Sequence, residues 1–333
     1  PAMPEVDFSK FGEIEARLKE ALRLPFVLET REPREDERHL VPVPANSHGL
    51  LRPFAILVQQ YGIPRFGEFD PTVLFAITFA AMFGMMFGDI GHGGVILLTG
   101  LLLRRKLGAF TYLFALAGLS SMLFGWLYGS IFGVEHWIEP LWISPMTDPI
   151  YMLTVALGWG VAFLTLGSAI AIGNRLLGGD LAGAIFAPGG LFALVLYLAL
   201  LGGVIWLVEY GEFPLLATGI IGLMLVLLVG FQWRHSSAPF GERLLTVLIE
   251  TFEIINGYVA SSLSFLRVAA FSLNHVALSL AVFTLADGMG TVGHWVTLII
   301  GNLFVIVLEG VIVAIQTLRL EYYEGFSRYF YGD

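Results

Sequence analysis

The chain of 333 residues is far more apolar than an ordinary soluble protein, because 56% of its residues are hydrophobic and only 14% are charged. This composition is typical of a protein with several membrane spans. The net charge of -9 argues against nucleic-acid binding, and the absence of cysteine excludes disulfides, thiolate metal sites and thiol nucleophiles.

Residues 1–70 are predicted to form a short cytoplasmic N-terminal segment, because they contain 21 of the 45 Asp, Glu, Lys and Arg residues. Residues 11–24 place apolar side chains at helical spacing, with mixed charges on the opposite face, which predicts a solvated helix. The next stretch, ETREPREDERHLVPVP, is expected to be irregular. The chain does not start with Met, so we expect a processed protein or the later part of a longer one.

Residues 71–333 are predicted to form an all-α, polytopic membrane helix bundle with about eight transmembrane helices. Long apolar runs approach the roughly 20 residues that are needed to cross a bilayer core of about 30 Å. The first two runs are short and interrupted by glycine, so one of them suits a tilted or re-entrant path. The runs cover residues 73–88, 91–103, 110–131, 149–172, 188–208, 214–233, 244–286 and 294–320.

The loops between these runs alternate in charge. Loops after odd-numbered runs contain acids but no Lys or Arg, whereas every even-numbered run is followed by basic residues. Since basic loops stay on the cytoplasmic side, both termini are expected to be cytoplasmic. The basic residues are Arg104, Arg105, Lys106, Arg175, Arg234, Arg243 and Arg328.

The seventh run is about twice as long as a bilayer requires. A continuous helix over residues 244–286 would extend about 64 Å, so it must tilt, bend or project into the cytoplasm. At 100° per residue its polar side chains fall on one stripe. The stripe follows Asn256, Arg267 and Asn274, with Glu253 and Ser264 to one side. The eighth run repeats this pattern with Glu309, Gln316 and Arg319.

Arg267 is the least expected residue in this stripe, because a guanidinium does not lose its proton and is costly to bury in a membrane. One interpretation is a structural salt bridge to an acid of this chain, such as Asp89 or Glu309. The alternative is that Arg267 faces an ion pathway, or a partner protein whose carboxylate binds it only transiently. A fixed positive charge favours deprotonation of such a carboxyl and repels a passing cation. Arg267 would then separate two aqueous half-paths.

Four motifs resemble the membrane-embedded stator subunit of V/A-type rotary ATPases, called subunit I in prokaryotes and subunit a in eukaryotes. They are YGIPRFGEFDPT (61–72), MFGMMFGDIGHG (82–93), LSFLRVAAFSLNHVALS (263–279) and LEGVIVAIQTLRLEYYEGF (308–326). The resemblance implies a stator beside a rotating ring of proteolipids, each with a membrane-buried carboxylate. It also implies peripheral-stalk and central-stalk subunits as partners, and residues 1–70 as the end of the stator's soluble domain.

The resemblance also implies roles for the polar residues. Arg267 would face the ring carboxylate, with Arg319 and Gln316 supporting it. Glu253 would line the cytoplasmic half-channel, and Glu309 and His275 the half-channel open to the outside. The wider proton path would include Asn274, Ser264, Asn256 and Asp89. Eukaryotic members commonly have His where this chain has Gln316, which favours a prokaryotic plasma membrane.

The chain is expected to be a non-catalytic subunit, because it lacks the motif GxxxxGK[ST] that binds the phosphates of ATP. No cofactor or metal is expected. Asp89 and His92 could ligate a metal, but we expect a polar helix turn because no third ligand is near in the sequence. Gly84 and Gly88 are expected to allow close helix packing. The alternative functions are a self-contained proton-coupled secondary transporter, using Asp89, Glu253, Arg267 and Glu309, and a purely structural membrane anchor.

Overall fold

The computed structural model describes Ala16, Lys19, Glu20 and residues 49–62, 69–134, 137–235 and 239–330. The chain divides into two compact units, Pro1–Pro42 and Val43–Asp333, and all named helices described below belong to the second unit. The helix predicted over residues 11–24 lies outside the described residues, apart from three helical positions. The predicted boundary at residue 70 stays a prediction.

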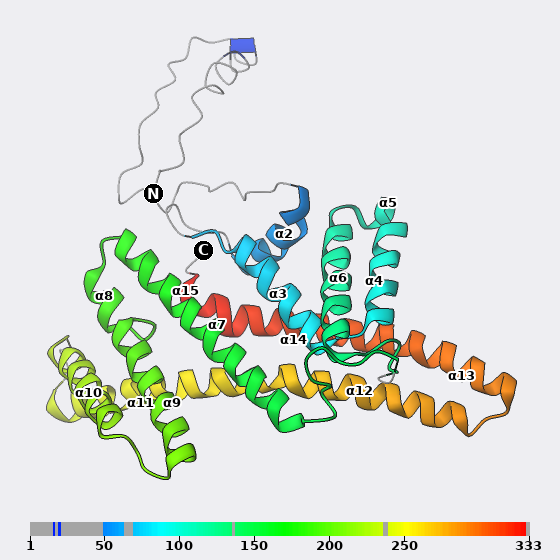
Figure 1. Ribbon diagram of the computed structural model, residues 1–333. Helices are drawn as coiled ribbons and strands as arrows, with labels where there is room; N and C mark the ends of the chain where they lie inside the picture. The colour runs from blue at the N-terminus through cyan, green and yellow to red at the C-terminus, as the bar shows by residue number, and fades with distance from the viewer. Residues whose placement is uncertain are drawn as a thin grey trace. The chain divides into compact units, whose positions relative to one another are not determined.

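The regular elements in the described ranges are helices, which confirms the all-α prediction (Figure 1). By length and composition, six helices in these ranges are able to cross a membrane. The first two predicted runs form two shorter helices, α3 (Thr72–Met86) and α4 (Ile90–Leu102). The eight expected spans therefore correspond to six long and two short apolar helices in the described ranges. The six long spans are Arg104–Tyr128, Pro149–Leu177, Leu181–Tyr210, Leu215–His235, Phe240–Asp287 and Thr291–Tyr329.

The first half of the second unit is built around an aromatic core. Phe75, Phe79 and Phe83 recur every four residues of α3 and therefore share one face of the helix. Phe54 of the preceding helix packs edge-on against Phe75 and Phe79. The helices are α2 (Arg52–Tyr61), α3 (Thr72–Met86), α4 (Ile90–Leu102), α5 (Arg104–Leu107) and α6 (Thr111–Tyr128).

Glycine allows α3 and α4 to approach α6 closely, as expected for Gly84 and Gly88. A Cβ atom added to Gly84 would overlap Oγ of Ser120, and one on Gly88 would lie 2.6 Å from the ring of Tyr128. Gly93 of α4 lies against backbone atoms: its Cβ would lie 2.8 Å from the carbonyl oxygen of Gly118. The backbones of α4 and α6 therefore lie almost in contact.

This packing predicts opposite outcomes for two adjacent glycines. Gly93→Ala should lower the Tm of the detergent-solubilised chain, because the new methyl group meets backbone atoms that have no room to move. Gly94→Ala is the matched control, since its methyl group would enter open space and alanine favours the helix by about 1 kcal/mol. Thermal unfolding followed by circular dichroism measures both, and equal Tm values would contradict the close approach.

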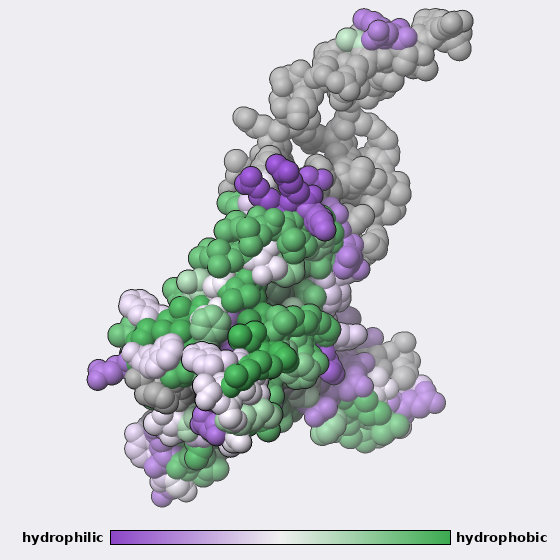
Figure 2. Space-filling view, turned by 90° about the vertical axis from the view of Figure 1, so that its right-hand side faces the viewer, coloured by the Kyte–Doolittle hydropathy of each residue, from purple (hydrophilic) through white to green (hydrophobic). Residues whose placement is uncertain are grey.

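The middle of the chain supplies helices with largely exposed apolar surfaces, which suit contact with lipid. Apolar surface is not confined to these helices, because Figure 2, which views the side of α4 in Figure 1, shows hydrophobic side chains over much of that face. In α10 only Ala217 and Leu228 are buried. Asp148 caps the first of these helices by accepting a hydrogen bond of 3.0 Å from the backbone N–H of Tyr151. The helices are α7 (Pro149–Leu177), α8 (Leu181–Phe186), α9 (Leu191–Tyr210) and α10 (Leu215–His235).

The C-terminal part forms two long rods, as predicted. In Figure 1, α11 and α12 follow one another nearly in line, and they lie across the direction of α4 and α6. The seventh run is therefore one extended path with a break at Phe265. The returning rod contains two π-helical turns, η4 and η5. The elements are α11 (Phe240–Ser264), α12 (Leu266–Asp287), α13 (Thr291–Phe304), η4 (Val305–Glu309), α14 (Gly310–Leu320), η5 (Glu321–Phe326) and α15 (Ser327–Tyr329).

Candidate functional site

Arg267 lies in the first turn of α12, just after the break at Phe265. Its side chain is half-buried, and one guanidinium nitrogen donates a hydrogen bond of 3.3 Å to Oγ of Ser264. Nη1 is buried and has no hydrogen-bond partner in the described part of the chain. None of the ion pairs between described residues includes Arg267. A salt bridge that locks the bundle, the first interpretation from sequence, is therefore absent from the described ranges.

The returning rod brings a second arginine toward the first. Arg319, in the last turn of α14, is exposed, and Gln316 one turn earlier is half-buried. Arg319 and Glu324 carry charges that act on Arg267. The positive charges of Arg267 and Arg319 therefore belong to one electrostatic neighbourhood, supplied by the two C-terminal rods.

The predicted polar stripe lies on an accessible face. Asn256 and Asn274 are exposed, and Ser264 is half-buried. Large apolar side chains share this surface: Phe252 is 67% exposed and Leu263 is 55% exposed. On α14, Val311 and Ile315 are 57% and 55% exposed. Leu263 precedes Arg267 by four residues, so Arg267 lies beside exposed apolar surface, which is the kind of surface that a partner helix or lipid covers.

A cavity of about 740 Å³ lies beside the N-terminal half of α11, which comes before Arg267 in the chain. Glu253 lines it, and so do Glu250 and His235, which sequence reasoning missed. Glu250 precedes Glu253 by one helical turn, so helical spacing could have found it. The cavity is lined by Phe186, Ala187, Pro188, Phe231, Gln232, His235, Thr246, Val247, Glu250, Glu253 and Ile254.

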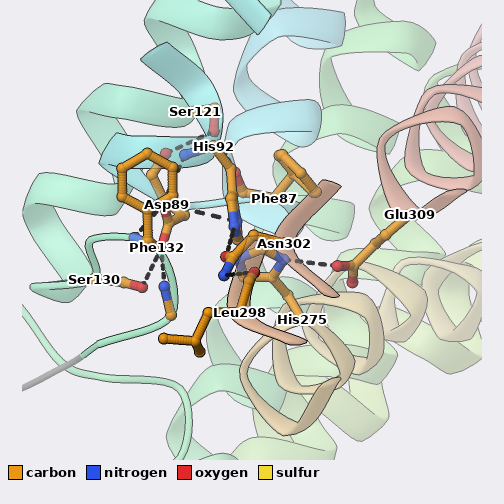
Figure 3. A network of polar contacts seen from close by, with 11 residues as sticks. Phe87, Asp89, His92, Ser121, Ser130, Phe132, His275, Leu298, Asn302 and Glu309 are labelled. Carbon is orange, nitrogen blue, oxygen red and sulfur yellow. Dashed lines mark hydrogen bonds and ion pairs between the residues drawn. The ribbon is translucent and has the colours of Figure 1, made fainter. Parts of the chain in front are cut away.

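On the other side of Arg267, α12 and η4 form a buried acid–imidazole pair (Figure 3). Nδ1 of His275 lies 2.7 Å from Oε2 of Glu309, and both side chains are almost fully buried. Nδ2 of Asn274 donates a longer bond, of 3.4 Å, to Oε1 of Glu309. The structure therefore joins three residues that sequence reasoning had assigned to the proton path.

Asp89, at the start of α4, extends the group of buried polar residues around His275 and Glu309. It caps α4, and its carboxylate accepts hydrogen bonds from four donors. Oδ1 accepts from the backbone N–H groups of His92 and Phe132, at 2.8 and 2.9 Å. Oδ2 accepts from Oγ of Ser130 and the backbone N–H of Gly133, at 2.6 and 2.8 Å. Asp89 therefore holds a segment that lies more than 40 residues later in the chain.

Two further members of this group, His92 and Asn302, were not among the site residues predicted from sequence. Nε2 of His92 lies 2.7 Å from Oδ1 of Asn302, although 210 residues separate them. Asn302 precedes Glu309 by seven residues, which is close to two helical turns, so its position on the same face gave a usable signal. His92 gave no such signal, because its partner lies on a distant helix.

The sequence-based reason for setting aside a metal site at Asp89 and His92 was wrong. A third ligand is near, because His275 joins them: one ligand atom from each of the three residues lies within 4.8 Å of the others. All three side chains are buried. The fold brings His275 to the pair from 183 positions along the chain, which no local spacing reveals.

Comparison with known proteins gives consistent matches. Residues 30–142 match the V-type ATPase 116kDa subunit family. The chain is 28% identical to the A-type ATP synthase subunit I of Thermococcus kodakarensis, over 92% of this chain and 48% of the relative. It is 26% identical to the subunit I of Methanocaldococcus jannaschii, over 92% of this chain and 49% of the relative. A shorter match, 36% identical over 39% of this chain and 29% of the relative, is to the V-type ATP synthase subunit I 2 of Treponema pallidum. The chain spans about half the length of the first two relatives.

Proposed function

Because this chain belongs to the subunit I family of V/A-type ATPases, we propose that it is the proton-translocating stator of such a rotary complex. In this role it lies against a rotating ring of proteolipids, in contact with stalk subunits and lipid. The chain provides two offset half-channels, and Arg267 separates them. We place it in a prokaryotic plasma membrane with both termini in the cytoplasm.

The observation that carries this proposal is the position of Arg267. Its guanidinium forms no ion pair with an acid in the described part of the chain, although the charge of Glu324 acts on it. One of its nitrogens has no hydrogen-bond partner there, and Arg267 lies beside exposed apolar surface. A permanently charged group in such a place needs an anion from another molecule or from water. A carboxylate on a proteolipid that moves past this surface meets that need.

The polar sites on either side of Arg267 support two separate half-paths. By the helical rise, Glu253 precedes Arg267 by about 21 Å and His275 follows it by about 12 Å along α11 and α12. Glu253 opens into the cavity beside α10, whereas His275 pairs with Glu309 at the buried cluster. Arg267 lies between these two sites along the path of α11 and α12, so the two polar sites lie on opposite sides of its charge.

The proposed cycle needs no covalent chemistry in this chain. A proton enters through one half-channel, neutralises a ring carboxylate, and travels through lipid on the ring as part of a neutral group. When the carboxyl reaches Arg267, the fixed positive charge favours the anionic form and the proton leaves through the other half-channel. Arg319 adds a second positive charge near the same point, and Gln316 supplies a polar group beside it.

Cysteine cross-linking tests the partner directly, because the natural chain contains no cysteine. Ala270→Cys and Val311→Cys place thiols on exposed positions of α12 and α14. Each is expected to form a disulfide with a cysteine introduced next to the proteolipid carboxylate, seen as a shifted band on a non-reducing gel of oxidised membranes.

The controls use neighbouring positions on the same helices. Ala269→Cys and Val313→Cys point into the chain, where both residues are fully buried, and should give no such product. A self-contained transporter would give no cross-link to a proteolipid from any of the four positions. That result would contradict the stator function.

A further inference from the structure

The buried cluster contains two imidazoles whose free nitrogens are both hydrogen-bond acceptors. Nδ2 of Asn302 donates to the carbonyl of Leu298 at 2.9 Å, so its Oδ1 faces His92 and accepts from Nε2–H. Nδ1 of His92 therefore carries a lone pair. His275 donates from Nδ1–H to the Glu309 carboxylate, which leaves a lone pair on its Nε2.

Neither lone pair is satisfied within the described part of the chain. Nδ1 of His92 and Nε2 of His275 are both buried and have no hydrogen-bond partner there. The two rings lie 5.3 Å apart, centre to centre, at an angle of 89°. The two lone pairs cannot bond to each other. A cation that accepts an electron pair from each imidazole nitrogen would satisfy both.

The third group is Asp89, which adds negative charge. One of its carboxylate oxygens and one ring nitrogen from each histidine all lie within 4.8 Å of one another. Oδ1 of Asp89 lies 3.7 Å from Nδ1 of His92. Its oxygens already accept four hydrogen bonds, so a direct bond to a cation requires a donor such as the Ser130 hydroxyl to turn away. With Glu309, the cluster holds two buried carboxylates, and no Lys or Arg forms an ion pair with either in the described ranges. A doubly charged cation would balance them.

We propose that His92, His275 and Asp89 form a binding site for a divalent transition-metal cation, with Zn²⁺ as the best-matched ion. Zn²⁺ takes imidazole nitrogen and carboxylate oxygen in tetrahedral geometry at about 2.0–2.2 Å, with a fourth position for water. Metal-binding histidines almost always donate their other N–H to a carboxylate or carbonyl oxygen. Glu309 and Asn302 supply these acceptors, so the imidazoles are oriented for a metal before it binds.

The site has a consequence that rests on the proposed function. His275 and Glu309 belong to the proposed outer half-channel, so bound Zn²⁺ would occupy the route of the proton. Zn²⁺ should then slow proton transport by the assembled complex. Metal binding itself is independent of that function and is measured without any transport assay.

A direct titration tests the site. The full chain, extracted from membranes in mild detergent and freed of metal with a chelator, is titrated with Co²⁺, whose visible absorption distinguishes tetrahedral from octahedral ligation. We expect one Co²⁺ per chain, a tetrahedral spectrum, and displacement by Zn²⁺. His92→Gln and His275→Gln should each weaken binding by more than about 100-fold, because each removes one of the few ligands.

Two variants separate a built site from adventitious binding. Asn302→Ala keeps all three ligands but removes the acceptor of the His92 N–H, and should weaken binding about 10- to 100-fold. His294→Gln alters a histidine that lies outside the cluster, near Asp287, and should bind like the natural chain. Circular dichroism without metal confirms that each variant is folded.

Saturable binding that is unchanged in the His92→Gln and His275→Gln variants would overturn the proposal. So would an octahedral spectrum or no saturable binding in the natural chain, either of which would assign the two lone pairs to water. If Co²⁺ binds as expected but Zn²⁺ leaves proton transport unchanged, the metal site stands and the assignment of this cluster to the half-channel fails.

Discussion

Arg267→Gln is expected to abolish both ATP-driven proton pumping and proton-driven ATP synthesis, while the chain still inserts and assembles. A nearby fixed charge lowers the pKa of a carboxyl group by about 1 to 3, so its loss reduces the tendency of the ring carboxyl to release its proton about 10- to 1,000-fold. Glutamine is shorter than arginine but keeps a polar side chain. Arg267 makes no ion pair in the described ranges, so the substitution removes none from the folded chain. Proton uptake into vesicles containing the purified complex measures the effect.

Two control variants sharpen this test. Arg243→Gln removes an arginine of α11 that lies over the ring of Trp233, 5.6 Å from its centre, and should preserve coupled transport. Arg267→Lys keeps a charge but loses the planar guanidinium, and lysine gives up its proton more readily when buried. We therefore expect a severe defect there too. Coupled transport that survives in Arg267→Gln would rule out the proposed role.

Asp89→Asn is expected to have the largest effect on stability. The carboxylate accepts four hydrogen bonds, two of them from the backbone of Phe132 and Gly133. Phe132 has a φ angle of 49°, a left-handed conformation that is unfavourable for a bulky residue. An amide would turn one acceptor oxygen into a donor that faces other donors. Since each buried unsatisfied donor costs about 1–3 kcal/mol, the total loss should reach at least about 3 kcal/mol.

Thermal unfolding in detergent and limited proteolysis between residues 129 and 148 measure this loss. Asp148→Asn is the matched control, because Asp148 is exposed and caps α7 with a single hydrogen bond to a backbone N–H. We expect a much lower Tm and faster cleavage for Asp89→Asn, and a small change for Asp148→Asn. Similar Tm values for the two variants would mean that Asp89 does not hold the segment around Phe132.

The sequence predicted the elements better than the contacts between them. Apolar run length and helical period are local properties, so they located the long spans, the extended seventh run and the stripe that includes Arg267. Asp89 and His92 were harder, because their partners lie on other helices: Ser130 is 41 residues away and Asn302 is 210. Periodicity says which face of a helix is polar, but it does not say which polar faces meet.

The two π-helical turns of the returning rod determine more than local shape. Its buried positions recur every fourth residue, at Val305, Glu309, Val313, Thr317, Glu321, Gly325 and Tyr329. In a uniform α-helix, six such steps would drift about 240° around the axis. Each π turn accommodates about one extra residue, or roughly 100°, so η4 and η5 together cancel most of this drift. Removing one residue at η4 would swing Arg319 about 100° away from its alignment with the upstream segment that carries Asn302. The number of residues in this rod, and not only their identity, therefore decides which side chains lie on the same face as Arg319.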